Sequence, residues 1–229
     1  MKKKNILWLY LFLMATILDM TFLIEGLNSY RFFSKPLILM SLIGYFFQIT
    51  RPISWTLLSK SVMGALIFSL IGDILLLWDW LFIYGLGAFF LAHICYIIAF
   101  KVSQKNPGRI LNVNFVELFF YNLPIYIAAA FVFYLINPTL GTLKFPVIAY
   151  IIVIVSMVTT ARERFKRCNM ESFWQVFLGA FLFFISDGIL AISKFYQDFP
   201  ESGVLIMGTY ATAQLLIVMG IRSHLIRPY

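Results

Sequence analysis

The sequence has little charge, little cysteine and little histidine. Only 12% of its 229 residues are charged and 62% are hydrophobic, whereas about a quarter of a soluble domain is charged. This composition excludes a disordered chain and a soluble domain, and it places most of the chain in lipid. The two cysteines and two histidines are too few for a disulfide framework or a histidine-rich zinc site. We therefore expect no metal site.

The apolar runs predict an all-α, polytopic membrane bundle of about eight transmembrane helices in one integral membrane domain, residues 1–229. Two polar connectors, Lys101 to Asn114 and Ala161 to Ser172, are the longest loops. No loop is long enough for a second domain, so any chemistry has to come from the helices themselves. The expected spans are about 5–24, 34–50, 55–78, 81–100, 115–136, 145–161, 173–193 and 203–221.

The basic residues are distributed unequally between the two sides of this predicted bundle. With eight spans, 14 of the 18 Lys and Arg residues fall on the side that carries both termini. The positive-inside rule places that side in the cytoplasm. The net charge of +8 is explained by this orientation, so we expect no nucleic-acid partner. A bacterial inner membrane suits such a protein, and the endoplasmic reticulum is the alternative.

Three aspartates lie inside the predicted spans. At about 1.5 Å of rise per residue, Asp19, Asp73 and Asp187 are roughly 7 to 11 Å from the non-cytoplasmic edge. An ionisable side chain at membrane depth is costly, so each one indicates a functional site. For Asp19 a role as a hydrated residue near a span end is equally consistent with the sequence.

Asp73 and Asp187 occur in similar surroundings. The segments Gly72-Asp73-Ile-Leu and Ser186-Asp187-Gly-Ile-Leu belong to the third and seventh spans. Two helices that are four spans apart run in the same direction, as in a parallel repeat of four plus four helices. We expect the two carboxyl groups to face one polar chamber that opens toward the outer half of the bilayer.

Two carboxyl groups in one chamber of low dielectric constant cannot both ionise cheaply. One keeps its proton and can act as an acid, while the other stays charged and can act as a base. Glycosidases use such a pair to protonate a leaving oxygen and to support an oxocarbenium-like centre. Paired membrane aspartates also occur in proton-coupled carriers, so a small transporter is the alternative function. A non-catalytic scaffold has no need of two buried acids.

Five motifs in order resemble the YhhN-like membrane proteins, a family that includes the lysoplasmalogenases. The motifs are Lys35-Pro36, Gly72-Asp73-Ile-Leu, Gly85 to Tyr96, Gly179 to Asp187, and Tyr210-Ala-Thr-Ala-Gln214. The resemblance covers most of the chain. Gly188 departs from it, because the residue after the second aspartate is often a small hydroxyl residue in that family.

The resemblance implies hydrolysis of the vinyl ether bond of lysoplasmalogens, to a fatty aldehyde and glycerophosphoethanolamine or glycerophosphocholine. It makes Asp73 and Asp187 the expected catalytic pair, with no metal or organic cofactor. Lys35 is an expected partner of the substrate phosphate or an interfacial anchor. His93 with Tyr96, and Tyr210 with Gln214, are spaced to face one side of a helix and could position water or the glycerol hydroxyl.

Overall fold

Each apolar run of the sequence forms a helix, because a backbone in lipid must satisfy its own N–H and C=O groups. The computed structural model describes residues 3–52, 55–105 and 115–227. In this part of the chain eight long helices are apolar enough to cross a membrane, which confirms the predicted all-helical bundle. They are α1 (Lys3–Ile24), α2 (Arg31–Thr50), α3 (Leu57–Leu75), α4 (Phe82–Val102), α5 (Phe115–Ile136), α6 (Lys144–Arg162), α7 (Met170–Phe195) and α8 (Ser202–Ile226).

Helices α2, α7 and α8 extend three or more residues beyond their predicted spans. Helix α2 begins at Arg31 and continues through Pro36, because a proline near the start of a helix removes few of its hydrogen bonds. Helix α8 continues to Ile226, so that His224 lies in its last turn, beyond the predicted end of this span at residue 221. Residues 106–114 of the predicted connector after α4 are outside the described residues, and the four-plus-four repeat stays a prediction.

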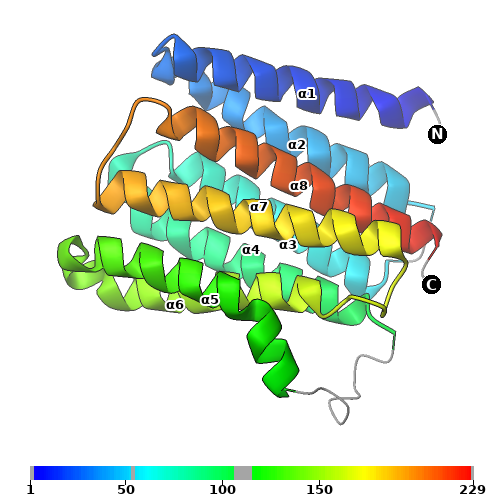
Figure 1. The fold of residues 1–229 in the computed structure, drawn as a ribbon. Coiled ribbons are helices and arrows are strands. Elements are labelled where there is room, and N and C mark those ends of the chain that lie inside the picture. The colour runs from blue at the N-terminus through cyan, green and yellow to red at the C-terminus, as the bar shows by residue number, and fades with distance from the viewer. Residues whose placement is uncertain (1–2, 53–54, 106–114, 228–229) are drawn as a thin grey trace.

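The helices lie roughly antiparallel, and the described chain begins and ends at the same end of the bundle (Figure 1). Helix α1 forms one edge of the bundle and α5 and α6 form the opposite edge. Helix α8 packs against α7, α1 and α2, while α4 packs against α3 and α6. Helices α7 and α8 approach closely at Gly179 and Gly220, where an added Cβ would lie 2.8 Å from the Ala213 carbonyl oxygen and 2.9 Å from the Val176 nitrogen, respectively.

A buried arginine joins three segments at the end of the bundle that carries the termini. Arg164, in the loop between α6 and α7, is fully buried. Its Nε donates to Ser103 Oγ at the end of α4 (2.9 Å), and its Nη2 donates to Ser172 Oγ at the start of α7 (2.7 Å). Burial lowers the pKa of Arg164 to about 10, so the side chain is still a cation at neutral pH. No carboxylate among the described residues pairs with it.

We expect Arg164→Ala to destabilise the bundle by about 2–4 kcal/mol, because it removes these hydrogen bonds and leaves a cavity between three segments. The measurement is the free energy of unfolding in detergent micelles. Lys101→Ala is the matched control: it removes an exposed cation paired with Glu163 and is expected to cost less than about 1 kcal/mol. Equal losses for the two variants would contradict a structural role for Arg164.

Candidate functional site

Two separate clusters of polar side chains lie between the helices, in the half of the bundle away from the end where the described chain begins and ends. The first, the Asp187 cluster, consists of His93 on α4, Tyr150 on α6 and Asp187 on α7. Tyr150 Oη donates to Asp187 Oδ2 at 2.5 Å, and His93 Nε2 lies 3.3 Å from the same oxygen and 2.9 Å from Tyr150 Oη. Three helices therefore meet at one carboxylate oxygen.

The Asp187 cluster opens onto an apolar cavity of about 270 Å³ between α4, α5, α6 and α7. Asp187 and Tyr150 line this cavity, and the rest of its lining is hydrophobic or glycine. The Asp187 side chain is 14% exposed. Both of its hydrogen-bond contacts with described residues use Oδ2, so Oδ1 is available to a molecule in the cavity.

The second cluster, the Asp73 cluster, consists of Lys35 on α2, Asp73 on α3 and Tyr210 on α8. Tyr210 Oη donates to Asp73 Oδ2 at 2.7 Å, and Lys35 Nζ lies 3.6 Å from Asp73 Oδ1. The Asp73 side chain is only 2% exposed, and Asp73 does not line the apolar cavity. Lys35 is thus buried against a carboxylate, whereas the sequence placed it at the outer edge.

Asp19 belongs to a neighbouring ion pair and is not a hydrated residue. It is fully buried, accepts a hydrogen bond from Ser34 Oγ at 2.6 Å, and pairs with Arg31 Nη2 at 3.2 Å. Arg31, Ser34 and Lys35 all lie in the first turns of α2. The start of α2 therefore supplies a cation to each of two buried aspartates, which compensates the cost of burying them.

Tyr96 and Gln214 form a further polar contact deeper in the bundle. Tyr96 Oη donates to Gln214 Oε1 at 2.5 Å, and Gln214 Nε2 donates to Ser69 Oγ at 3.1 Å. Ser69 lies one turn from Asp73 on α3, as Gln214 lies one turn from Tyr210 on α8. Two polar contacts on successive turns therefore fix the register of α3 and α8.

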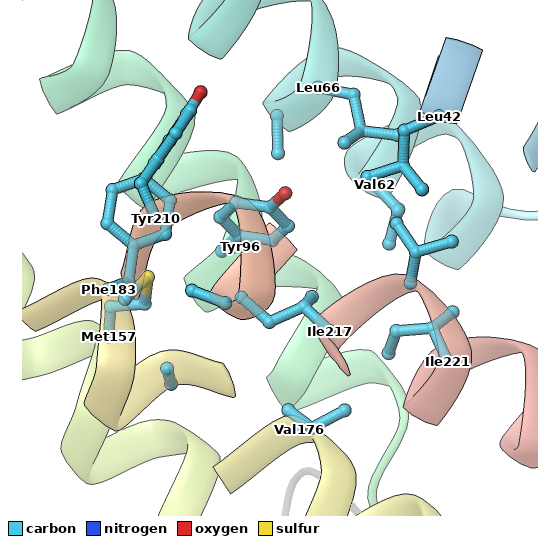
Figure 2. Close-up of a cluster of buried hydrophobic side chains, with 14 of the residues drawn as sticks. Leu42, Val62, Leu66, Tyr96, Met157, Val176, Phe183, Tyr210, Ile217 and Ile221 are labelled. Atoms are coloured by element: carbon cyan, nitrogen blue, oxygen red, sulfur yellow. The ribbon is translucent and has the colours of Figure 1, made fainter. Parts of the chain in front are cut away.

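Two phenylalanine rings separate the clusters. The Phe183 ring centroid lies 4.8 Å from that of His93 and 5.3 Å from that of Tyr210, and Figure 2 shows the Phe183 and Tyr210 side chains next to each other. Phe89 lines the cavity, and its ring centroid lies 5.8 Å from that of Tyr210. An added Cβ at Gly72 would lie 2.6 Å from Phe89 Cδ2, so the absence of a side chain at Gly72 lets this ring lie against α3 beside Asp73.

The structure brings the predicted site residues together in three separate groups and not in one. His93 joins Asp187, Lys35 and Tyr210 join Asp73, and Tyr96 joins Gln214. The single chamber expected for both aspartates differs from the structure, in which only Asp187 faces the cavity and the rings of Phe89 and Phe183 fill the space between the clusters. Tyr150 was not among the predicted site residues, because the mostly apolar sequence of α6 does not indicate which of its faces meets α7.

Comparison with known sequences places this arrangement in a family. The sequence profile described as the YhhN family matches residues 30–221. The chain belongs to the YhhN family. The match includes all the residues of the Asp187 and Asp73 clusters but not Asp19.

Several relatives of this YhhN protein have names that state an activity. The chain is 32% identical over 169 residues to the Mus musculus protein named Lysoplasmalogenase TMEM86B, covering 71% of this chain and 66% of the relative. It is 29% identical over 195 residues to the Homo sapiens protein of that name, covering 85% and 76%. It is 33% identical over 168 residues to the Mycobacterium tuberculosis Lysoplasmalogenase, covering 69% and 59%. The matched part of the chain thus spans slightly less than two thirds of the mouse relative. No solved structure matches the chain.

We expect Tyr150→Phe to destabilise the protein by about 1 kcal/mol, because it removes the donor to Asp187 Oδ2 and leaves a buried acceptor with one partner fewer. The ring contact with His93, at 5.3 Å between centroids, is retained. The free energy of unfolding in detergent is the measurement, and Tyr134→Phe, at an exposed tyrosine of α5, is the control. A loss no larger than that of the control would show that this hydrogen bond contributes nothing.

Proposed function

We propose that this YhhN protein hydrolyses the vinyl ether bond of lysoplasmalogens and releases a fatty aldehyde and glycerophosphoethanolamine or glycerophosphocholine. The main support is that one carboxyl group, Asp187, lies in the wall of a cavity that is otherwise lined almost entirely by apolar groups. An apolar cavity with a single acid suits a substrate that joins an alkenyl chain to an oxygen atom. The names of the relatives agree with this substrate class.

The chemistry needs a proton at carbon. A vinyl ether accepts a proton at the β-carbon, which gives an oxocarbenium ion. Water adds to this ion and loses a proton, and the resulting hemiacetal breaks its C–O bond to give the aldehyde and the glycerol hydroxyl. General acid catalysis of the first step and stabilisation of the cation are what two carboxyl groups can supply.

Asp187 is the acid in this proposal. Its carboxyl group faces the cavity, and among the described residues no Lys or Arg pairs with it. Tyr150 and His93 hold Oδ2, so the proton on Oδ1 is the one directed toward the alkenyl group.

Asp73 is the ionised carboxylate in this proposal, because the Lys35 ammonium and the Tyr210 hydroxyl both stabilise a negative charge on it. Its negative charge stabilises the oxocarbenium ion from the other side of the Phe89 and Phe183 rings. Tyr210, Gln214, His93 and Tyr96 then position water and the glycerol oxygen. An ammonium has three donors, so Lys35 can bind the substrate phosphate while it is paired with Asp73.

We expect Asp187→Asn and Asp73→Asn each to lower the rate of aldehyde release by about 10²-fold or more, the size of a general acid–base contribution. Both changes keep the shape of the side chain and remove its ionisable proton. The assay uses purified protein in detergent with a lysoplasmalogen. Asp198→Asn is the matched control, because Asp198 lies in the exposed connection between α7 and α8.

Near-normal rates in both variants would contradict the two-carboxylate mechanism. A proton-coupled carrier is distinguished by the wild-type protein itself, because a carrier releases no aldehyde in detergent and moves its substrate only across a sealed membrane with a gradient.

We also propose that the protein resides in a bacterial inner membrane with both termini in the cytoplasm. The described chain begins and ends at one end of the bundle (Figure 1), and most basic residues belong to that end. A reporter that works only in the cytoplasm is expected to be active when it is fused to residue 1 or to residue 229. A reporter that works only in the periplasm is expected to be inactive at both positions. A periplasmic-type reporter that is active at either terminus would reverse the orientation and place both aspartates in the cytoplasmic half.

A further inference from the structure

We propose that the cavity beside Asp187 binds the alkenyl chain of the substrate and that the small side chain of Ala191 leaves the cavity open to the longer chains. This inference rests on the proposed function and adds a specificity-determining residue to it. It follows from the position of the cavity relative to the reactive carboxyl group.

The cavity extends along α7 from Phe184, on one side of Asp187, to Phe195 near the C-terminal end of the helix. Asp187, Gly188, Ala191 and Phe195 all line it. At about 1.5 Å of rise per residue, Ala191 lies roughly 6 Å and Phe195 roughly 12 Å from Asp187 along the helix axis. The number of residues between Asp187 and a position on α7 therefore gives the distance of that position from the Asp187 carboxyl group along the helix axis.

The part of the cavity beyond Asp187 has no polar side chain. Toward the outer end, α4, α5 and α6 contribute Phe82, Ile136 and Val147. A phosphate headgroup placed there would lose its water without gaining a donor, which is costly, whereas a hydrocarbon chain gains from burial. The headgroup therefore lies on the side of Asp187 that faces His93 and the Asp73 cluster, and the chain lies along α7.

Two aromatic rings that pack against each other, Phe82 and Phe195, line the outer end of the cavity. The Phe82 and Phe195 rings meet edge to face with centroids 5.5 Å apart. Beside them Lys194 Nζ pairs with Asp79 Oδ1 at 2.5 Å and lies 5.4 Å from the Phe82 ring centroid. An alkenyl chain that extends along α7 from Asp187 meets the Phe82 and Phe195 rings. The distance from Asp187 to these rings therefore sets the longest chain that the cavity can hold in an extended form.

Small residues keep the middle of this path open. An added Cβ at Gly188 would lie 3.8 Å from Val132 Cγ2 on α5, an ordinary contact distance that shows how near the facing wall is. Ala191 lies almost one turn further along the same side of α7 and has only a methyl group in the cavity. A phenylalanine at this position would occupy the path about 6 Å beyond the acid.

The test compares rates on lysoplasmalogens whose alkenyl chains range from six to twelve carbons. We expect Ala191→Phe to lower kcat/KM for the longest chains by at least tenfold and to leave the shortest within about twofold of wild type. Ala191→Leu is expected to give an intermediate loss. Ala149→Phe is the control, because Ala149 is exposed on α6 and lies outside the cavity lining.

Equal loss for short and long chains, or no loss for either, would overturn the assignment of Ala191. Unfolding temperatures in detergent identify a variant that fails to fold. If Ala191→Phe fails to fold, the rates on short and long chains are compared between the wild type and Ala191→Leu.

A second readout separates this inference from the proposed function. Saturated O-alkyl lysophospholipids of the same chain lengths cannot be hydrolysed by enol ether protonation, and their dissociation constants are measured for wild type and Ala191→Phe. Weaker binding of only the long chains supports the chain site even if the protein releases no aldehyde. Binding that is unchanged at every length overturns the chain site even if hydrolysis is observed.

Discussion

The site depends on how the bundle accommodates the Asp187 carboxyl group in an apolar interior. A buried carboxyl group is tolerated only if its oxygens have hydrogen-bond partners. Its partners Tyr150 and His93 come from α6 and α4, so this one oxygen atom fixes the rotation of three helices about their own axes. The same three helices, with α5, form the walls of the cavity. The hydrogen bonds that compensate the cost of placing the Asp187 carboxyl group in an apolar interior therefore also determine the shape of the cavity beside this group.

Asp73 is accommodated differently. Its partners are a lysine from α2 and a tyrosine from α8, and the nearby Asp19–Arg31 pair adds one charge of each sign. Asp187 is thus held by hydrogen-bond contacts with a tyrosine and a histidine at a cavity wall, and Asp73 is held by a lysine and a tyrosine in a closed interior. Two carboxyl groups in such different environments suit different roles, as in enzymes that use one carboxylic acid and one carboxylate. The Phe89 and Phe183 rings keep the environments apart.

Much of the fold was predictable, because in lipid the length of an apolar run determines the helix. The eight spans, the free cysteines and the burial of Asp73 follow from composition and spacing. The pairing of Tyr210 with Asp73, of His93 with Asp187 and of Tyr96 with Gln214 did not follow. A membrane helix is apolar on every side, so its sequence does not indicate which face is buried. For this reason Tyr150 was not predicted as a partner of Asp187. The burial of Lys35 was missed because α2 begins earlier than the apolar run.

The most direct test is a structure of Asp187→Asn in complex with a saturated O-alkyl lysophospholipid, determined by electron cryomicroscopy. The account predicts that the ether oxygen and its first alkyl carbons lie beside residue 187, that the chain extends along α7 past Ala191, and that the phosphate lies toward Lys35. A lipid bound instead in the apolar groove between α2 and α3, near Phe47 and Trp55, with no lipid density beside residue 187, would contradict it.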